Sequence, residues 1–161
     1  MKFPKLQATG NDFVLVDALT ASRKSDRAEL ARAICDCHFG VGADGLMLAE
    51  HSTIADLKMR IFNSDGSEAD ISGNGLRCFA RYAIEKGLVD KISARARQRK
   101  RLLTVETLSG VRKIEAYMSG NKVKRVKVNM GLPRFQPAQI PVKIAGHTVP
   151  ILNYPLDYWT T

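Results

Sequence analysis

The sequence predicts an α+β fold. Its hydrophobic pattern gives two short strands, a helix, further strands, a second helix and then a run of strands joined by tight turns. This segregation of helices and strands indicates an α+β arrangement, because a parallel βαβ sheet would require regular alternation of the two. The chain has 161 residues, of which 45% are hydrophobic and 25% charged. That length and composition are typical of a globular protein with one domain or two small ones.

The first part of the chain predicts strands followed by one helix. A strand over Lys2 to Gln7 is broken by Ala8 to Asn11, and the apolar run over Asp12 to Asp17 indicates a buried strand. Asp26, with Glu29 three residues later, resembles a capping box. A helix is therefore expected through about Cys37, with helical spacing of its apolar positions Leu30, Ile34 and Cys37.

A glycine-rich loop and two further strands lead to the second helix. The loop covers Gly40 to Gly45 and runs into the apolar residues Leu46 to Leu48. Residues Leu57 to Phe62 alternate between apolar and basic, which is the period of a half-buried strand. The helix after Gly75 has Leu76, Phe79, Ala80, Ala83 and Ile84 on one face, and Gly87 stands at the expected C′ position.

The rest of the chain predicts β structure. Strands are expected over Leu102 to Leu108, Val111 to Tyr117 and Lys122 to Met130, with glycine-containing hairpin turns between them. The segments Lys5 to Phe13 and Lys127 to Phe135 also share a pattern of Lys, alternation, Gly and Phe. This weak internal repeat suggests that a second copy of the first unit begins near residue 122.

The charge pattern bears on the partners of the chain. The formal net charge is +9 and the isoelectric point about 9.7, with a basic stretch around Arg95 to Arg101. Neither an interleaved aromatic side chain nor a helix-turn-helix or zinc pattern accompanies these charges, which argues against a nucleic-acid partner. No apolar run has the length of a membrane helix or the form of a signal peptide, and three cysteines do not make a disulfide framework. We therefore expect a cytoplasmic protein without a membrane partner.

The densest polar segment precedes the second helix. Ser72, Gly73, Asn74 and Gly75 would place free backbone N–H groups at the helix N-terminus, where they can bind a carboxylate or another anion. The alternative interpretation is an ordinary loop with Asn74 as N-cap. Asn11 and Asn63 each follow a predicted strand or its break, and either can bind the polar ends of an amino acid or serve as a turn residue.

The cysteines are interpreted as core residues. The segment Cys35 to His38 carries the Cys-x-Cys-His pattern but no second pair of metal ligands at a distance, so a metal site is not expected. Both Cys35 and Cys37 fall on the packed face or the end of the first helix. Cys78 lies inside the second helix beside Phe79 and is likewise expected in the core.

Four motifs in order resemble diaminopimelate epimerase: GNDFV (Gly10 to Val14), HFGVGADGL (His38 to Leu46), the block from Arg60 to Tyr82, and VETLSG (Val105 to Gly110). The resemblance implies interconversion of LL- and meso-diaminopimelate, for lysine and cell-wall synthesis, without a cofactor. It implies a fold of two pseudo-symmetric halves, each a mixed sheet around a central helix and each presenting one catalytic cysteine. Asn11 and Asn63 would bind substrate, Gly73 and Asn74 would contact its reacting carboxylate, and Ser72 occupies the position of the first cysteine.

The chain departs from that family in two respects. Ser72 stands where the family has cysteine, and the chain stops before the region that would carry the second cysteine. The resemblance therefore divides it into a first half-domain, residues 1–118, and an incomplete start of the second, residues 119–161. A serine hydroxyl is a far weaker acid than a thiol, so the chain as given is expected not to epimerise.

The sequence also leaves two other functions open, and it predicts that the chain associates with itself. The alternatives are another cofactor-independent amino-acid racemase of the same fold and a non-catalytic truncated binding module. A homo-oligomer is expected because the apolar residues after residue 122 would lack sheet partners and face water. These residues are Val123, Val126, Val128, Ile140, Val142, Ile144, Val149 and Ile151.

Overall fold

The computed structural model describes residues 3–19, 26–89 and 99–140, together with 142, 149, 150 and 152. The chain divides into two compact units, residues 1–130 and 131–161. Of the residues discussed above, Lys2, Ile144, Ile151 and residues 95–98 of the basic stretch lie outside the described part. The half-domain boundary after residue 118 remains a prediction, because the division at residue 130 concerns packing within this chain.

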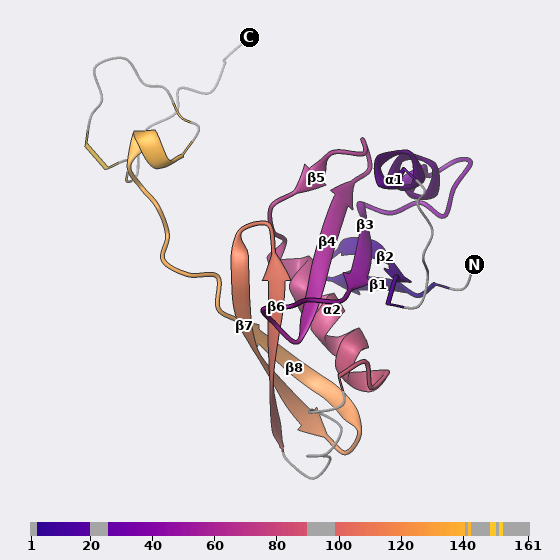
Figure 1. Ribbon diagram of the computed structural model, residues 1–161. Coiled ribbons are helices and arrows are strands. Elements are labelled where there is room, and N and C mark those ends of the chain that lie inside the picture. The colour runs from indigo at the N-terminus through magenta and orange to yellow at the C-terminus, as the bar shows by residue number, and fades with distance from the viewer. Residues whose placement is uncertain are drawn as a thin grey trace. The chain divides into compact units, whose positions relative to one another are not determined.

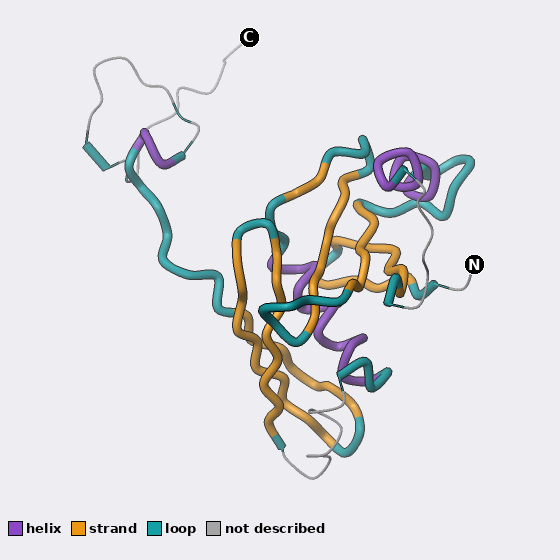
Figure 2. The backbone as a smooth tube through the Cα atoms, viewed as in Figure 1, coloured by secondary structure: helices purple, strands orange, loops and turns teal. Residues whose placement is uncertain are grey.

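The first unit is built on one mixed sheet with the strand order β1-β2-β3-β4-β6-β7-β8, and β5 pairs with β4 (Figures 1 and 2). Two neighbouring pairs, β2–β3 and β4–β6, are parallel, and the others are antiparallel. This architecture confirms the α+β class. The strands are β1 (Lys5–Ala8), β2 (Asn11–Asp17), β3 (Gly45–Glu50), β4 (Leu57–Asn63), β5 (Glu68–Ala69), β6 (Lys100–Thr107), β7 (Gly110–Ser119) and β8 (Lys122–Val128).

Two helices cover the two faces of the sheet. Alternation along β2 sends Phe13 and Leu15 into the cluster that contains α2 (Gly73–Glu85), and Val14 and Val16 into the cluster that contains α1 (Arg27–Cys35). Both faces are thus buried here, which explains why β2 reads as a continuous apolar run. The larger cluster extends from β2 to β8, because the strands at both ends of the sheet order contact α2.

Helix α2 ends at its C-terminus as the sequence predicts, but its N-cap is a different residue from the one considered above. At its C-terminus, Gly87 adopts φ +66°, its N–H donates to Ile84 O, and the N–H of Leu88 donates to Ala83 O. These bonds form a Schellman motif, so the C′ prediction for Gly87 is confirmed. At the N-terminus the cap is Ser72, and the alternative with Asn74 as cap is wrong.

Helix α1 begins as predicted and ends early. Asp26 caps it by accepting hydrogen bonds from the N–H groups of Ala28 and Glu29, and the last helical residue is Cys35. The carboxylate of Asp36 accepts from the N–H groups of His38 and Phe39, both at 2.7 Å, which favours a turn over another helical turn. Cys35 is buried as expected, but Cys37 is exposed, so its assignment to the packed face is wrong.

The prediction that β8 exposes its apolar residues is also wrong. β8 pairs with β7 in the same sheet, Val123 is only 6% exposed, and Val126 and Val128 pack partly buried against the α2 cluster. A partner strand and a helix within this chain therefore cover residues that were expected to need another chain.

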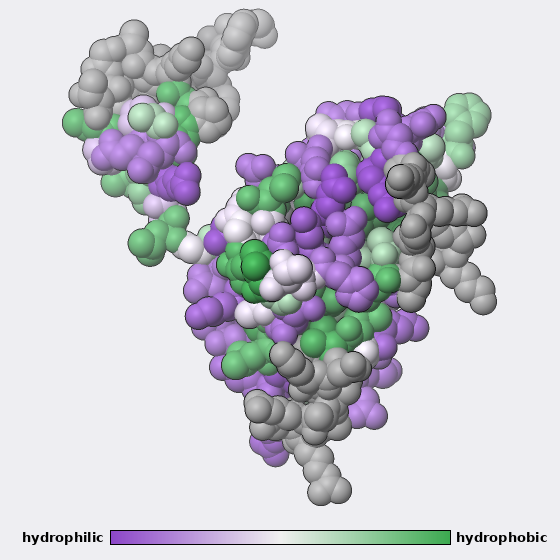
Figure 3. Space-filling model, in the orientation of Figure 1, coloured by the Kyte–Doolittle hydropathy of each residue, from purple (hydrophilic) through white to green (hydrophobic). Residues whose placement is uncertain are grey.

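The second unit has little regular structure among its described residues. A 3₁₀ turn spans Pro137–Gln139, Ile140 is partly buried, and Val142 and Val149 are exposed. In the part of the chain that the structure describes, no helix combines the length and apolar character needed to cross a membrane. On the face of the first unit seen in Figure 3, hydrophilic side chains predominate and apolar ones form small patches.

Candidate functional site

The N-terminus of α2 is the centre of the candidate site. The hydroxyl of Ser72 accepts from the N–H of Gly75 at 3.0 Å, and the carbonyl of Ser72 accepts from the N–H of Leu76 at 2.8 Å. The N–H groups of Gly73 and Asn74 have no acceptor inside the helix, because they belong to its first turn. They lie at the positive end of the helix dipole and can bind an anionic group.

A cavity of about 490 Å³ opens beside this helix end. Ser72, Gly73 and Asn74 line it from α2, and residues of β8 and the segment after it line the opposite side. A Cβ atom on Gly73 would lie in ordinary contact, at 3.5 Å, with the sulfur of Met130, which also lines the cavity. Arg77 and Lys127 add positive charge to the lining. The cavity suits an anion-bearing small molecule.

Asn74 and Asn11 are brought together across 63 residues of sequence. The Asn74 side-chain nitrogen donates to Asn11 Oδ1 at 3.5 Å, and the Asn74 oxygen accepts from Thr9 Oγ1 at 3.1 Å and from the guanidinium of Arg77. Asn11, Ser72, Gly73 and Asn74 therefore lie in one neighbourhood where β2 begins and α2 begins. Asn11 and Asn74 are both half-buried.

The junction between β2 and the loop before β3 holds Asn11 from the other side. One carboxylate oxygen of Asp44 accepts from Asn11 Nδ2 at 2.6 Å and from the N–H of Asp12 at 2.8 Å. In return, Asp12 Oδ1 accepts from the N–H of Asp44 at 3.0 Å, and Asp12 pairs with Lys5 at 2.9 Å. The hydrogen bond from Lys5 is the main reason why the pKa of Asp12 lies below its usual value.

Thr9 occupies a strained position next to the site. It forms with Gly10 the two-residue turn between β1 and β2, and the two residues have φ values of +54° and +84°. Two successive positive φ values are typical of a type I′ hairpin turn, which favours Asn and Gly and disfavours a β-branched residue. The strain accompanies the contact between the Thr9 hydroxyl and Asn74.

Asn63 lies at the same end of the sheet but not in this cluster. It ends β4 and pairs in register with Gly45, which follows Asp44. Its side-chain nitrogen donates to Ser67 Oγ at 2.9 Å, and its N–H donates to Ser67 O at 2.8 Å, within the turn before β5. Asn63 thus serves as a turn residue, as the second of its two interpretations expects, and a substrate contact remains a prediction.

Asp44, Arg77 and Thr9 are site neighbours that the sequence analysis did not single out. Arg77 has a local signal, because it follows Asn74 by three residues and so lies on the same side of the helix. Asp44 has none, because its contact with Asn11 spans 33 residues and depends on the parallel pairing of β2 with β3. Thr9 is visible only as part of the break before Asn11.

In the described part of the chain, the buried cysteines Cys35 and Cys78 do not add a nucleophile to the site. Burial raises the pKa of Cys35, with Asp12 and Asp44 adding to the shift, and burial also raises the pKa of Cys78. Both thiols are therefore poor nucleophiles at neutral pH. Among the described residues, no group of three or more His, Cys, Asp or Glu side chains is arranged to hold a metal ion.

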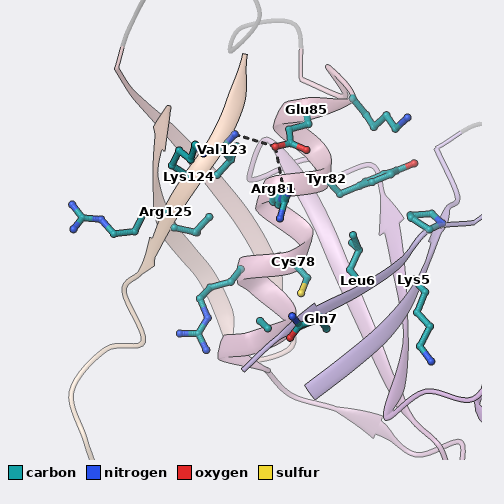
Figure 4. Close-up of a pocket in the computed structure, with 15 residues that line it drawn as sticks. Lys5, Leu6, Gln7, Cys78, Arg81, Tyr82, Glu85, Val123, Lys124 and Arg125 are labelled. Carbon is teal, nitrogen blue, oxygen red and sulfur yellow. Dashed lines mark hydrogen bonds and ion pairs between the residues drawn. The ribbon is translucent and has the colours of Figure 1, made fainter. Parts of the chain in front are cut away.

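A second cavity, also of about 490 Å³, runs along α2 between β1 and β8 (Figure 4). Leu6, Cys78 and Tyr82 contribute to its lining, and Glu85 accepts from Arg81 and from the N–H of Val123. None of the sequence-predicted site residues lines it. The cavity at the N-terminus of α2 is the better candidate for chemistry.

Solved structures show which class of protein has this fold. The described fold is similar to that of a hydroxyproline epimerase from Agrobacterium vitis, with a TM-score of 0.61 and 15% identity over 80% of this chain and 40% of that one. It is equally similar to a probable proline racemase from Agrobacterium radiobacter K84, with a TM-score of 0.62 and 16% identity over 80% of this chain and 41% of the other. The chain therefore has a fold that a hydroxyproline epimerase and a probable proline racemase share, and this likeness concerns the fold alone.

The sequence identifies the family within that fold. The family model for diaminopimelate epimerase matches residues 3–136, so the chain belongs to the diaminopimelate epimerase family. The diaminopimelate epimerase of Caldanaerobacter subterraneus subsp. tengcongensis is 50% identical over 143 residues, which are 89% of this chain and 48% of that protein. The Moorella thermoacetica protein of the same name is 45% identical over 157 residues, 98% of this chain and 52% of that protein. The chain spans about half the length of the curated relatives it matches.

Proposed function

We propose that the cavity at the N-terminus of α2 binds one amino-acid end of diaminopimelate, and that this chain corresponds to one half of an epimerase that interconverts the LL and meso isomers. The observation that carries the proposal is the convergence of Asn11, Ser72, Gly73 and Asn74 at one helix end. The family resemblance assigns substrate contacts to Asn11, Gly73 and Asn74, and it gives Ser72 the position of the first catalytic cysteine. Membership of the family and the racemase-type fold support the proposal.

The chemistry explains why a helix N-terminus suits this reaction. The α-proton of an amino acid is very weakly acidic, so the developing carbanion must be stabilised by positioned donors in a site that excludes water. The N–H groups of Gly73 and Asn74 would bind the carboxylate that carries the developing charge. Proton removal on one face and delivery on the other would then invert the α-carbon without a cofactor, which is the reaction the family resemblance implies.

Ser72 limits what this half can do alone. A thiolate at a helix N-terminus is a competent base because the dipole lowers the thiol pKa. A serine hydroxyl has no such acidity, and the oxygen of Ser72 is already engaged with the N–H of Gly75. We infer that the chain as given binds substrate without epimerising it.

Exchange of the substrate's α-protons with solvent tests this inference directly. LL-diaminopimelate incubated with the chain in D₂O should exchange its α-protons no faster than without protein, as followed by proton NMR. Exchange well above that background would mean that Ser72 or another group acts as a base. The Ser72→Cys variant is the matched comparison, since it restores the family's residue.

Calorimetric titration tests the ligand class. LL- and meso-diaminopimelate should bind, whereas binding of another amino acid alone would favour a different racemase of this fold. Binding of RNA without diaminopimelate would favour a non-catalytic module that uses the basic residues. The absence of heat with both diaminopimelate isomers, confirmed by a second binding assay, would contradict the proposed function.

We further propose a substrate contact by Asn63, a second half-domain that begins within this chain, and a cytoplasmic location. Asn63 would contact substrate from the end of β4 once a ligand displaces its bond with Ser67. Residues 119–161 would begin the second half-domain. All three cysteines are free thiols, which supports a cytoplasmic location.

A homo-oligomer remains part of the proposal on a changed set of residues, of which only Val142 and Val149 belong to the predicted set. Leu132, Val142, Val149 and Leu152 are exposed apolar side chains of the second unit, and such residues favour association. Light scattering at several concentrations should show a mass above that of the monomer. A monomer at every concentration would exclude this assembly.

A further inference from the structure

The side-chain amides of Asn11 and Asn74 each contact a charged residue outside the proposed substrate contacts. A side-chain amide presents a donor at one end and an acceptor at the other, and its orientation is set by its partners. Asn11 and Asn74 form a hydrogen-bonded row of two such amides, with Asp44 at the Asn11 end and Arg77 at the Asn74 end. Whether each end residue donates or accepts sets the donor-to-acceptor direction of every hydrogen bond in this row.

Asp44 fixes Asn11 because a carboxylate only accepts hydrogen bonds. Its oxygen lies 2.6 Å from Asn11 Nδ2 and 2.8 Å from the N–H of Asp12, a backbone donor that cannot reverse. Asn11 must therefore turn its NH₂ group toward Asp44 and its oxygen toward Asn74. Reversal would place the Asn11 oxygen against a carboxylate oxygen, which is repulsive.

Arg77 fixes Asn74 because a guanidinium only donates. Its contact with Asn74 Oδ1 requires the oxygen of that amide, because a guanidinium has no lone pair to accept from an NH₂ group. The NH₂ group of Asn74 then faces Asn11, as the 3.5 Å distance between Asn74 Nδ2 and Asn11 Oδ1 records. Both end residues thus require the same order of donation: Arg77 donates to Asn74, Asn74 to Asn11, and Asn11 to Asp44.

We propose that Asp44 and Arg77 are positioning residues that hold Asn11 as an acceptor and Asn74 as a donor toward the ligand. Asn11 keeps one free lone pair on Oδ1, and Asn74 keeps one free N–H beside the helix N-terminus. An acceptor next to a donor matches the ammonium and the carboxylate of an α-amino acid. This assignment rests on the proposed function for its ligand, whereas the amide orientation itself does not depend on it.

Side-chain NMR of the 161-residue chain, labelled with ¹⁵N-asparagine, tests the orientation without any ligand. In the unaltered protein the Asn11 NH₂ protons should be shifted and protected from exchange. Asp44→Ala should abolish that signature, whereas Asp44→Asn should retain it, since an amide oxygen can replace the carboxylate. Asp12→Ala is the matched control: it removes bonds of the same junction but none to the Asn11 side chain, so the signature should persist.

Ligand discrimination supplies a readout that loss of structure alone would not move. Pimelate has the carbon chain and both carboxylates of diaminopimelate but no ammonium group. The preference for LL-diaminopimelate over pimelate should fall about tenfold in Asp44→Ala and stay within about twofold in Asp12→Ala, as expected for one charge-directed hydrogen bond.

The outcomes separate the two levels of the proposal. An Asn11 signature that survives Asp44→Ala, or that Asp12→Ala abolishes equally, would overturn the positioning role. A signature that follows the expected pattern while neither ligand binds would uphold the orientation and overturn the proposed function instead. Arg77→Met should alter the Asn74 side-chain signals and leave those of Asn11 in place, and the reverse pattern would also contradict the assignment.

Discussion

Replacement of Ser72 by alanine measures the role of its hydroxyl in holding the site. The Ser72 oxygen accepts from the N–H of Gly75, and Gly75 is buried, so water cannot replace the lost acceptor. Loss of an N-cap costs typically about 1 kcal/mol, and an unsatisfied buried donor costs about 1–3 kcal/mol. The two figures describe the same bond, so we expect Ser72→Ala to lower the free energy of unfolding by about 1.5 kcal/mol.

Urea denaturation followed by far-UV circular dichroism is the assay. With a dependence on urea of about 1–3 kcal/mol per molar, the midpoint should fall by roughly 0.5–1.5 M. Ser72→Thr keeps a hydroxyl at the cap and should restore most of the loss. Asn74→Ala is the critical comparison, because Asn74 bonds Asn11, Thr9 and Arg77 and not the helix backbone. An unchanged midpoint in Ser72→Ala would contradict the cap assignment, whatever the cost of Asn74→Ala.

Two further perturbations address strain and charge. Thr9→Gly should raise the urea midpoint, because it removes a β-branched residue at φ +54°, where backbone strain costs about 1–3 kcal/mol. The same change loses the hydroxyl that contacts Asn74. An unchanged or lower midpoint would argue against strain at this turn. Glu68 accepts both hydrogen bonds of the Arg60 guanidinium, at 2.7 and 2.8 Å, and Arg60 thereby lowers the pKa of Glu68 below its ordinary 4.5. A depressed carboxyl pKa adds stability above the unfolded-state value and loses it as the pH falls through the folded-state value. The unfolding free energy should therefore decline below about pH 4.5, and Glu68→Gln should flatten that decline; an identical pH profile in both proteins would exclude the pair as its source.

The sequence predicted best where local rules act alone. The Schellman end at Gly87, the cap at Asp26 and the alternation along β4 all follow from residues within one turn or one strand of each other. The same locality explains the error at Cys37. Its spacing continues the helix, but the Asp36 side chain competes for the next two N–H groups and ends it.

Long-range pairing could not be predicted from the sequence. Periodicity identifies β2, β3, β4 and β6 as strands but does not say that β2–β3 and β4–β6 are parallel neighbours. The burial of Val123 depends on β8 joining β7 and α2, which no local pattern specifies. For the same reason the sequence indicated Asn11 and Asn74 as site residues separately, while the bonds that join them to Asp44 and Arg77 required the fold.

The most direct test of the account is a ¹H–¹⁵N NMR titration of the chain with LL-diaminopimelate. We expect the backbone signals of Gly73 and Asn74 and the side-chain signal of Asn11 to shift in a saturable manner, because these groups face the cavity at the N-terminus of α2 or lie directly beside it. Shifts confined to Leu6, Cys78 and Tyr82 in the second cavity, or no saturable shift at all, would contradict it.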